Sequence, residues 1–137
     1  MISPRRYAGF SPRSSSQHAV RLRNLSRRGV HDLIAPSIFP AEAASALTKA
    51  ERQKLIPVGQ ADLFLTDIFS TPPIIHPYEP LLRRAVTISS QSRSGLFDCL
   101  HVALAEREGC EVVTDDQKLI ANLKSQFPFI VTLASLP

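Results

Sequence analysis

Short apolar runs alternate with longer amphipathic segments from about residue 30 to the end of the chain. Four of the apolar runs have the length and the sharp boundaries of buried strands. They cover residues 33–35, 74–76, 111–114 and 129–133. The segments between them carry apolar residues at helical spacing and predict helices over residues 38–54, 60–69, 79–90, 95–108 and 116–125. Strands that alternate with helices are typical of a parallel sheet covered on both faces, so we predict an α/β fold.

Serine and glycine residues mark the expected ends of two of these helices. Ser37 and Ser94 each precede an apolar helical segment, and a serine hydroxyl there can accept a hydrogen bond from the first free N–H groups of the helix. Gly109 follows the second of these helices and is expected to end it. We therefore predict Ser37 and Ser94 as N-caps and Gly109 as a helix stop.

The first 16 residues differ from the rest of the chain. They show neither strand nor helix periodicity, and two prolines, a glycine and a run of serines favour irregular structure. A short helix is predicted over residues 17–28. We therefore divide the chain into an irregular basic N-terminal segment, residues 1–16, and one α/β domain, residues 17–137.

The net charge of +4 does not indicate a basic nucleic-acid-binding face. Residues 1–30 contain seven arginines and no acidic residue, whereas the remaining 107 residues carry nine basic and twelve acidic groups, a net charge of −3. The basicity therefore belongs to one end of the chain. No apolar run approaches the ~18 residues needed to cross a bilayer. Cys99 and Cys110 are expected to be reduced thiols in the core of a cytoplasmic protein.

Four acidic residues lie next to apolar segments, where charged groups rarely occur without a partner. Asp115 and Asp116 directly follow the apolar run that ends at Thr114. Glu42 borders the apolar stripe of one predicted helix, and Asp98 lies in the first turn of another that is apolar nearly all round. Carboxylates at the carboxyl end of a buried strand are typical of a ligand site at the rim of an α/β sheet.

Each of these acids also has a purely structural explanation. Glu42 and Asp98 lie in first helical turns, where a carboxylate interacts favourably with the helix dipole. Asp115 or Thr114 could cap the following helix, although a cap explains one carboxylate of the adjacent pair and not both. His101, three residues after Asp98, faces the same side of its helix. It is either a ligand or, more simply, a hydrogen-bonded core histidine.

If the fold brings these carboxylates together around an open pocket, as we expect, their natural partner is a divalent cation. Clustered carboxylates are hard oxygen ligands, which suit Mg²⁺ or Mn²⁺ better than zinc. Such an ion could position a phosphodiester, lower the pKa of an attacking water and stabilise the leaving oxygen. The sequence contains no glycine-rich phosphate loop, and no Ser/His/Asp or Cys/His motif stands out.

Three segments resemble the PIN-domain family, in particular the VapC-type toxins of bacterial toxin–antitoxin modules. They are Ile34–Glu42, Leu96–Glu106 and Glu111–Leu119, and their order and spacing fit from about Gln17 to the C-terminus. The most specific part of the match is the combination of the second segment with the Val-Thr-Asp-Asp run of the third.

The resemblance implies a three-layer α/β/α sandwich with a central parallel sheet and an acidic pocket that holds Mg²⁺ or Mn²⁺. Carried over by position, Glu42, Asp98 and Asp116 would be the catalytic and metal-binding acids. Asp115 would be an auxiliary metal ligand, and the Thr114 hydroxyl would support the ligands from behind. The implied activity is endonucleolytic cleavage of RNA, held in check by a cognate antitoxin. Such toxins are commonly homodimers.

One departure from the family pattern concerns the N-terminus. The family opens with an apolar strand that bears the first acid of the pocket, but here no acidic residue precedes Asp32, which itself lies before the second strand. We therefore expect the first strand to be missing or altered, through an atypical or frame-shifted N-terminus. The chain is then either a metal-dependent endoribonuclease or a degenerate, inactive PIN-fold protein that still binds antitoxin or nucleic acid.

A third class, a phosphoacceptor or nucleotide-binding α/β domain, is disfavoured. Paired acids in receiver-like domains follow the first strand, whereas Asp115 and Asp116 come near the end of this chain.

Overall fold

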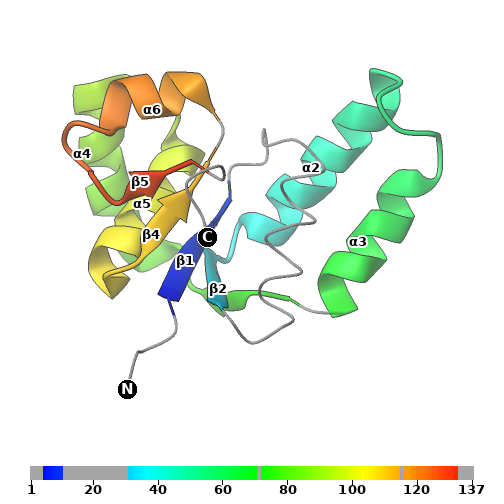
Figure 1. Cartoon of the computed structure of the whole chain (residues 1–137), viewed down its shortest axis with the longest axis horizontal. Coiled ribbons are helices and arrows are strands. Elements are labelled where there is room, and N and C mark those ends of the chain that lie inside the picture. The colour runs from blue at the N-terminus through cyan, green and yellow to red at the C-terminus, as the bar shows by residue number, and fades with distance from the viewer. Residues whose placement is uncertain (1–4, 11–30, 71, 115, 133–137) are drawn as a thin grey trace.

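The computed structural model describes residues 5–10, 31–70, 72–114 and 116–132 of the 137-residue chain. Within these residues five strands form one sheet in the order β3-β2-β1-β4-β5, and every neighbouring pair is parallel. The strands are β1 Arg5–Phe10, β2 His31–Pro36, β3 Ile74–His76, β4 Glu111–Val113 and β5 Ile130–Val131. The helices are α2 Phe39–Arg52, α3 Gln60–Ser70, the 3-10 turn η1 Glu79–Leu81, α4 Leu82–Ser92, α5 Leu96–Glu108 and α6 Gln117–Leu123 (Figure 1).

Helices cover both faces of the sheet, as predicted. Alternate side chains of a strand point to opposite faces, and on β2 Ile34 belongs to the main core whereas Ala35 belongs to a smaller cluster. The main core lies between the sheet and α4, α5 and α6, and α5 packs against β1, β2 and β4. The smaller cluster joins Ala35 to Phe39 and Ala43 of α2 and to Ile68 of α3. The predicted α/β sandwich with a central parallel sheet is therefore confirmed.

The segment predicted to be irregular, residues 1–16, contains the central strand of the sheet. β1 pairs with β2 on one side and with β4 on the other. The prediction was wrong for Arg5–Phe10 because this sequence has no clear alternation, whereas two neighbouring strands supply its ladder hydrogen bonds. The register shifts between Tyr7 and Phe10, a stretch that contains Gly9, and a glycine inside a strand often marks such an irregularity. The first strand is therefore present but altered, since it contains no acidic residue. The helix predicted over residues 17–28 lies outside the described residues.

Of the three predicted helix ends, only Gly109 is confirmed. It ends α5 with φ 67°, in the left-handed region that glycine adopts without steric cost. Ser37 does not cap α2, because its hydroxyl oxygen instead accepts the backbone N–H of Tyr78 at 3.1 Å. Ser94 does not cap α5; it is buried, and its carbonyl oxygen accepts the hydroxyl of Ser89 at 2.6 Å. Ser37 therefore binds the loop after β3, and Ser94 binds the last turns of α4, and neither caps a helix.

The most deeply packed helix is α5, in which the seven residues Cys99–Ala105 are all buried. The α2–α3 arm, residues Phe39–Ser70, is a helical hairpin that projects from one side of the molecule, on the right in Figure 1. In the described part of the chain, no helix combines the length and the hydrophobicity needed to cross a bilayer.

Candidate functional site

The strand order reverses at one edge of the sheet, where α/β folds commonly bind ligands. From β1 the chain proceeds outward through β2 to β3, and it then crosses to the other side of β1 to form β4 and β5. In open α/β sheets, ligands bind at the carboxyl ends of the strands where the order reverses in this way. Here that point lies at the end of β1, between β2 and β4.

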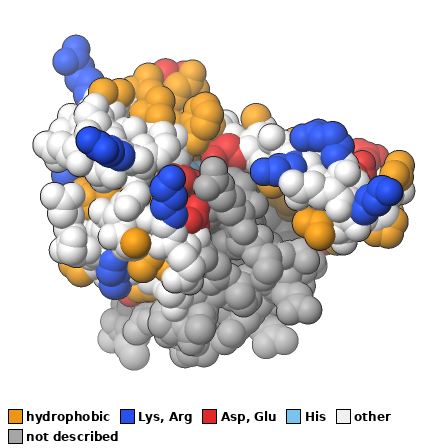
Figure 2. Space-filling view, turned by 90° about the horizontal axis from the view of Figure 1, so that it is seen from above, with side chains coloured by type: hydrophobic (Ala, Val, Ile, Leu, Met, Phe, Trp, Pro, Cys, Tyr) orange, Lys and Arg blue, Asp and Glu red, His pale blue; other side chains and the backbone are white. Residues whose placement is uncertain are grey.

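The predicted acids lie at the N-terminal ends of three helices, and these ends lie near this edge of the sheet. Glu42 lies in the first turn of α2, soon after β2, and Asp116 directly precedes α6, soon after β4. Asp98 lies in the first turn of α5. Only two residues separate the end of α5 from β4, so α5 runs opposite to the strands and its N-terminal turn points toward their carboxyl ends. Figure 2 looks onto this edge and shows acidic side chains in the middle of the molecule, between the α2–α3 arm and the rest.

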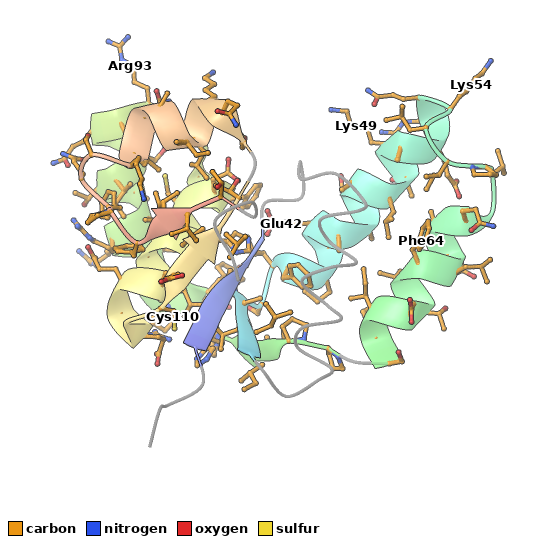
Figure 3. The ribbon with its side chains drawn as sticks, in the orientation of Figure 1. Glu42, Lys49, Lys54, Phe64, Arg93 and Cys110 are labelled. Atoms are coloured by element: carbon orange, nitrogen blue, oxygen red, sulfur yellow. The ribbon has the colours of Figure 1, made fainter. Side chains whose placement is uncertain are left out.

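A direct side-chain contact joins α2 to α5. Oε1 of Glu42 lies 2.8 Å from Nε2 of His101, and the two side chains are only 13% and 5% exposed. Figure 3 shows Glu42 at the inner end of α2, facing the centre of the molecule. Of the two interpretations of His101, the hydrogen-bonded core histidine is therefore confirmed.

Asp116 is the N-cap of α6. Its Oδ1 accepts the backbone N–H groups of Lys118 at 3.0 Å and Leu119 at 3.2 Å. Its own backbone N–H donates to the hydroxyl oxygen of Thr114 at 3.0 Å, and Thr114 is almost fully buried. The structural explanation of the acidic pair had Asp115 or Thr114 as the cap, whereas Asp116 has that role because it immediately precedes the helix. Asp115 lies outside the described residues.

The donor chemistry of these acids suits a hard divalent cation, but their arrangement does not form a complete site. Among the described residues, no three acidic, histidine or cysteine side chains lie close enough to hold a metal ion. Glu42 already contacts His101, and Asp116 already caps a helix. The described residues therefore do not by themselves form a metal site, and the convergence of Glu42, Asp98 and Asp116 stays a prediction.

Cys99, next to Asp98 in α5, is not suited to chemistry at this site. Burial in the core raises the pKa of its thiol to about 11, and the neighbouring Asp98 carboxylate acts in the same direction. A hydrogen bond with Ser92 opposes both effects. The thiol therefore stays protonated at neutral pH, and the thiolate that a metal ion or an electrophile would need is not formed.

The Glu42–His101 contact is the part of the site that sequence reasoning missed. The two residues lie 59 positions apart, so no local spacing connects them. A signal was available, because Glu42 borders an apolar helical stretch, His101 lies within one, and such polar residues need a partner. That signal predicts a partner without identifying it.

Comparisons with known proteins agree with this fold. Residues 7–124 match the model of the PIN domain family. The chain is 36% identical over 101 residues to Ribonuclease VapC3 of Mycobacterium tuberculosis, in strain CDC 1551 / Oshkosh and in strain ATCC 25618 / H37Rv. The match covers 74% of this chain and 69% of that protein.

A solved structure is similar over almost the whole chain. The crystal structure of PAE2754 from Pyrobaculum aerophilum superposes with a TM-score of 0.68 over 98% of this chain and 94% of that one. Its sequence identity of 18% means that this similarity establishes the fold alone. With the domain match and the sequence identity to a VapC ribonuclease, the chain belongs to the PIN-domain family, among its VapC-type ribonucleases.

Proposed function

We propose that this chain is a metal-dependent endoribonuclease and the toxin of a toxin–antitoxin module. Glu42, Asp98 and Asp116 are its catalytic and metal-binding acids, with Asp115 as an auxiliary ligand and Thr114 as a supporting hydroxyl. The observation that carries the proposal is the position of α2, α5 and α6, whose first turns or cap bring three acids to the carboxyl edge around the end of β1.

The reaction is hydrolysis of an RNA phosphodiester, in which a P–O bond to a ribose oxygen breaks and water supplies the new oxygen. Bound Mg²⁺ or Mn²⁺ would lower the pKa of that water and stabilise the charge on the leaving oxygen. The role of Glu42, Asp98 and Asp116 is to hold the ion. The Thr114 hydroxyl orients the backbone before α6 by accepting the Asp116 N–H. This bond and the two N–H bonds to Oδ1 fix the direction of the Asp116 carboxylate.

The partners in this proposal are an RNA substrate, a cognate antitoxin protein and a second copy of the chain, all in the cytoplasm. Large apolar side chains on the surface support a role in protein contacts. Leu55 and Val58, between α2 and α3, are 73% and 90% exposed, and Val86 and Phe97 are also exposed. Light scattering of the purified chain, alone and with its antitoxin, tests this part.

The activity is tested with a ribonuclease assay in the presence and absence of Mg²⁺. We expect cleavage that needs the ion and that falls at least about 10-fold in Asp98→Asn, since loss of even an outer partner of a metal site costs that much. Asp62→Asn is the matched control, because it makes the same chemical change in the first turn of α3, at an exposed position. Equal activity of the Asp98→Asn variant and the wild type would contradict the proposed site.

A second candidate is a catalytically inactive PIN-fold protein that retains antitoxin or nucleic-acid binding. Two observations favour it: β1, Arg5–Phe10, contains no acid, and the described residues hold no three-residue metal cluster. A missing first carboxylate removes one ligand and one negative charge, so we expect Mg²⁺ binding and cleavage to be weak in this chain. Binding of single-stranded RNA without its cleavage, at any Mg²⁺ or Mn²⁺ concentration, would establish this candidate.

Adding an acid at the end of β1 separates the two candidates. Gly9→Asp and Phe10→Asp each add a carboxylate at one of the last two positions of β1. We expect one of the two variants to bind Mn²⁺ and cleave RNA at least about 10-fold better than the wild type, and the other serves as its control. If neither variant exceeds the wild type, a carboxylate at these two positions does not complete the site.

A further inference from the structure

The Glu42–His101 contact connects two layers of the fold at a buried position. Oε1 of Glu42 and Nε2 of His101 lie 2.8 Å apart, which is the distance of a charge-assisted hydrogen bond. Both side chains are largely withdrawn from solvent, with exposures of 13% and 5%. At such a position the two groups satisfy each other, and removing one leaves the other unpaired.

The chemistry of the two groups decides which way this hydrogen bond runs. An ionised carboxylate has no proton and only accepts hydrogen bonds, so Nε2 of His101 donates to Oε1 of Glu42. His101 is thus a donor to Glu42. Nδ1 of His101 is buried and has no hydrogen-bond partner among the described residues.

We propose that His101 is a positioning residue that fixes the carboxylate of Glu42 for divalent-cation binding. This proposal rests on the role of Glu42 in the proposed function. A glutamate side chain has three torsions, and the entropy lost when a mobile glutamate becomes ordered lowers its affinity for an ion. The hydrogen bond from His101 orders one carboxylate oxygen in advance. In metal sites, ligating carboxylates are hydrogen-bonded in this way by neighbouring groups.

The packing of α5 makes His101 a rigid support. His101 lies within the run of buried residues Cys99–Ala105, so its ring cannot change rotamer without disturbing the core. By contrast, only Phe39 and Ala43 are buried on α2. The tightly packed helix α5 therefore supports, through His101, the Glu42 carboxylate of the less buried helix α2.

A direct ligand role for His101 does not fit the same geometry. Its Nε2 is engaged with Glu42, and its Nδ1 is buried. The histidine acts on the ion only through the glutamate.

The test measures Mn²⁺ affinity by titration calorimetry on the full chain, together with Tm. We expect His101→Leu to weaken Mn²⁺ binding about 10–100-fold, the usual effect of losing an outer-shell partner. His101→Gln should stay within a few-fold of the wild type, because its side-chain amide can donate to Glu42. Val102→Ala is the matched control, since it removes buried volume from the same helix and leaves the contact in place. It should lower Tm without changing Mn²⁺ affinity.

Two results would overturn the proposal: unchanged Mn²⁺ affinity in a folded His101→Leu variant, or an equal loss in Val102→Ala. If His101→Leu does not fold, ¹⁵N NMR of the wild-type imidazole decides instead. A proton on Nε2 supports the donor role, and a proton on Nδ1 alone contradicts it.

The outcomes also separate this proposal from the proposed function. Mn²⁺ binding that depends on His101 in a chain that cleaves no RNA supports the positioning role and contradicts the ribonuclease. RNA cleavage together with a Mn²⁺ affinity that does not depend on His101 supports the ribonuclease and contradicts the positioning role. A wild-type chain that binds no Mn²⁺ contradicts both.

Discussion

The two helices that meet at Glu42 and His101 are held in the fold in different ways. α5 is buried without interruption from Cys99 to Ala105, whereas only Phe39 and Ala43 are buried on α2. The position of His101 is therefore set by a packed core, and the position of Glu42 depends on a few contacts in the first turn of its helix. Only one of the two supports of the site is rigid through its own packing.

Beyond its first turn the α2–α3 arm is held partly by polar contacts. Oε1 of Glu51 accepts the backbone N–H groups of Gly59 at 2.9 Å and Ala61 at 2.8 Å, and it thereby joins the end of α2 to the start of α3. Leu55 and Val58 in the same connection are exposed. Regions with few buried apolar contacts open at lower free energy than a core, so we expect the arm to be the less stable half of the domain.

Core truncation should give the largest difference between the two regions. Leu104→Ala removes a fully buried side chain of α5 and should lower the free energy of unfolding by about 2–5 kcal/mol. Leu63→Ala makes the same change on α3, where the side chain is 60% exposed, and should cost less than about 0.5 kcal/mol. Urea denaturation measures both. Similar losses for the two variants would show that the arm is packed as tightly as the core.

Removing the polar link of the arm should have a smaller effect. Glu51→Ala leaves two N–H groups without their acceptor and should lower the free energy of unfolding by about 1–2 kcal/mol. Hydrogen exchange at Gly59 and Ala61 should accelerate in this variant. Glu51→Gln is the control, because its amide oxygen can still accept both bonds. Unchanged exchange in the alanine variant would mean that the link does not hold the arm.

The smallest effect is expected for the ion pair between α4 and α5, which lies on the surface of the rigid half. Arg84 and Glu106 form two hydrogen bonds of 2.7 and 3.0 Å, but their side chains are 46% and 38% exposed. A double-mutant cycle with Arg84→Met and Glu106→Gln should give a coupling of about 0.2–1 kcal/mol. A larger coupling would show that polar contacts stabilise this half as well.

The pH dependence of that coupling has a definite sign. The hydrogen bond from Arg84 lowers the pKa of the Glu106 carboxyl in the folded state, against an opposing effect of burial. A lowered folded-state pKa contributes stability above the unfolded pKa and loses it as the pH falls through the folded one. The coupling should therefore be present at neutral pH and disappear in acid. A coupling that persists below the pKa of Glu106 would show that it does not depend on the negative charge of this carboxylate.

Sequence reasoning succeeded where the signal is local. The strands and helices after residue 30 follow from apolar spacing. The acids were singled out because they interrupt apolar segments, and their role in a metal site stays a prediction. β1 was missed, because the strand character of Arg5–Phe10 comes from pairing with β2 and β4 and not from its own pattern. Tertiary context of this kind routinely overrides intrinsic strand preference.

Sequence reasoning did not assign the helix caps and the side-chain partners correctly, for a related reason. Ser37 could have bonded the first turn of α2, but the fold places the Tyr78 N–H within reach of the same hydroxyl. His101 and Glu42 each needed a partner, and only the packing of α5 against the sheet determined which one. The sequence shows which polar groups need a hydrogen-bond partner, and the fold determines which group that partner is.

The central place of β1 has a consequence for how the chain matures on the ribosome. Tyr7 pairs with Leu33 on one side and with Glu111 on the other, so one neighbour is synthesised early and the other near the end. Pairings between distant residues slow folding, and proteins emerge from their N-terminus first. While synthesis continues toward residue 111, one edge of β1 has no neighbour. Such an edge is a template for pairing with another chain. A nascent chain stalled before β4 should therefore be prone to aggregate.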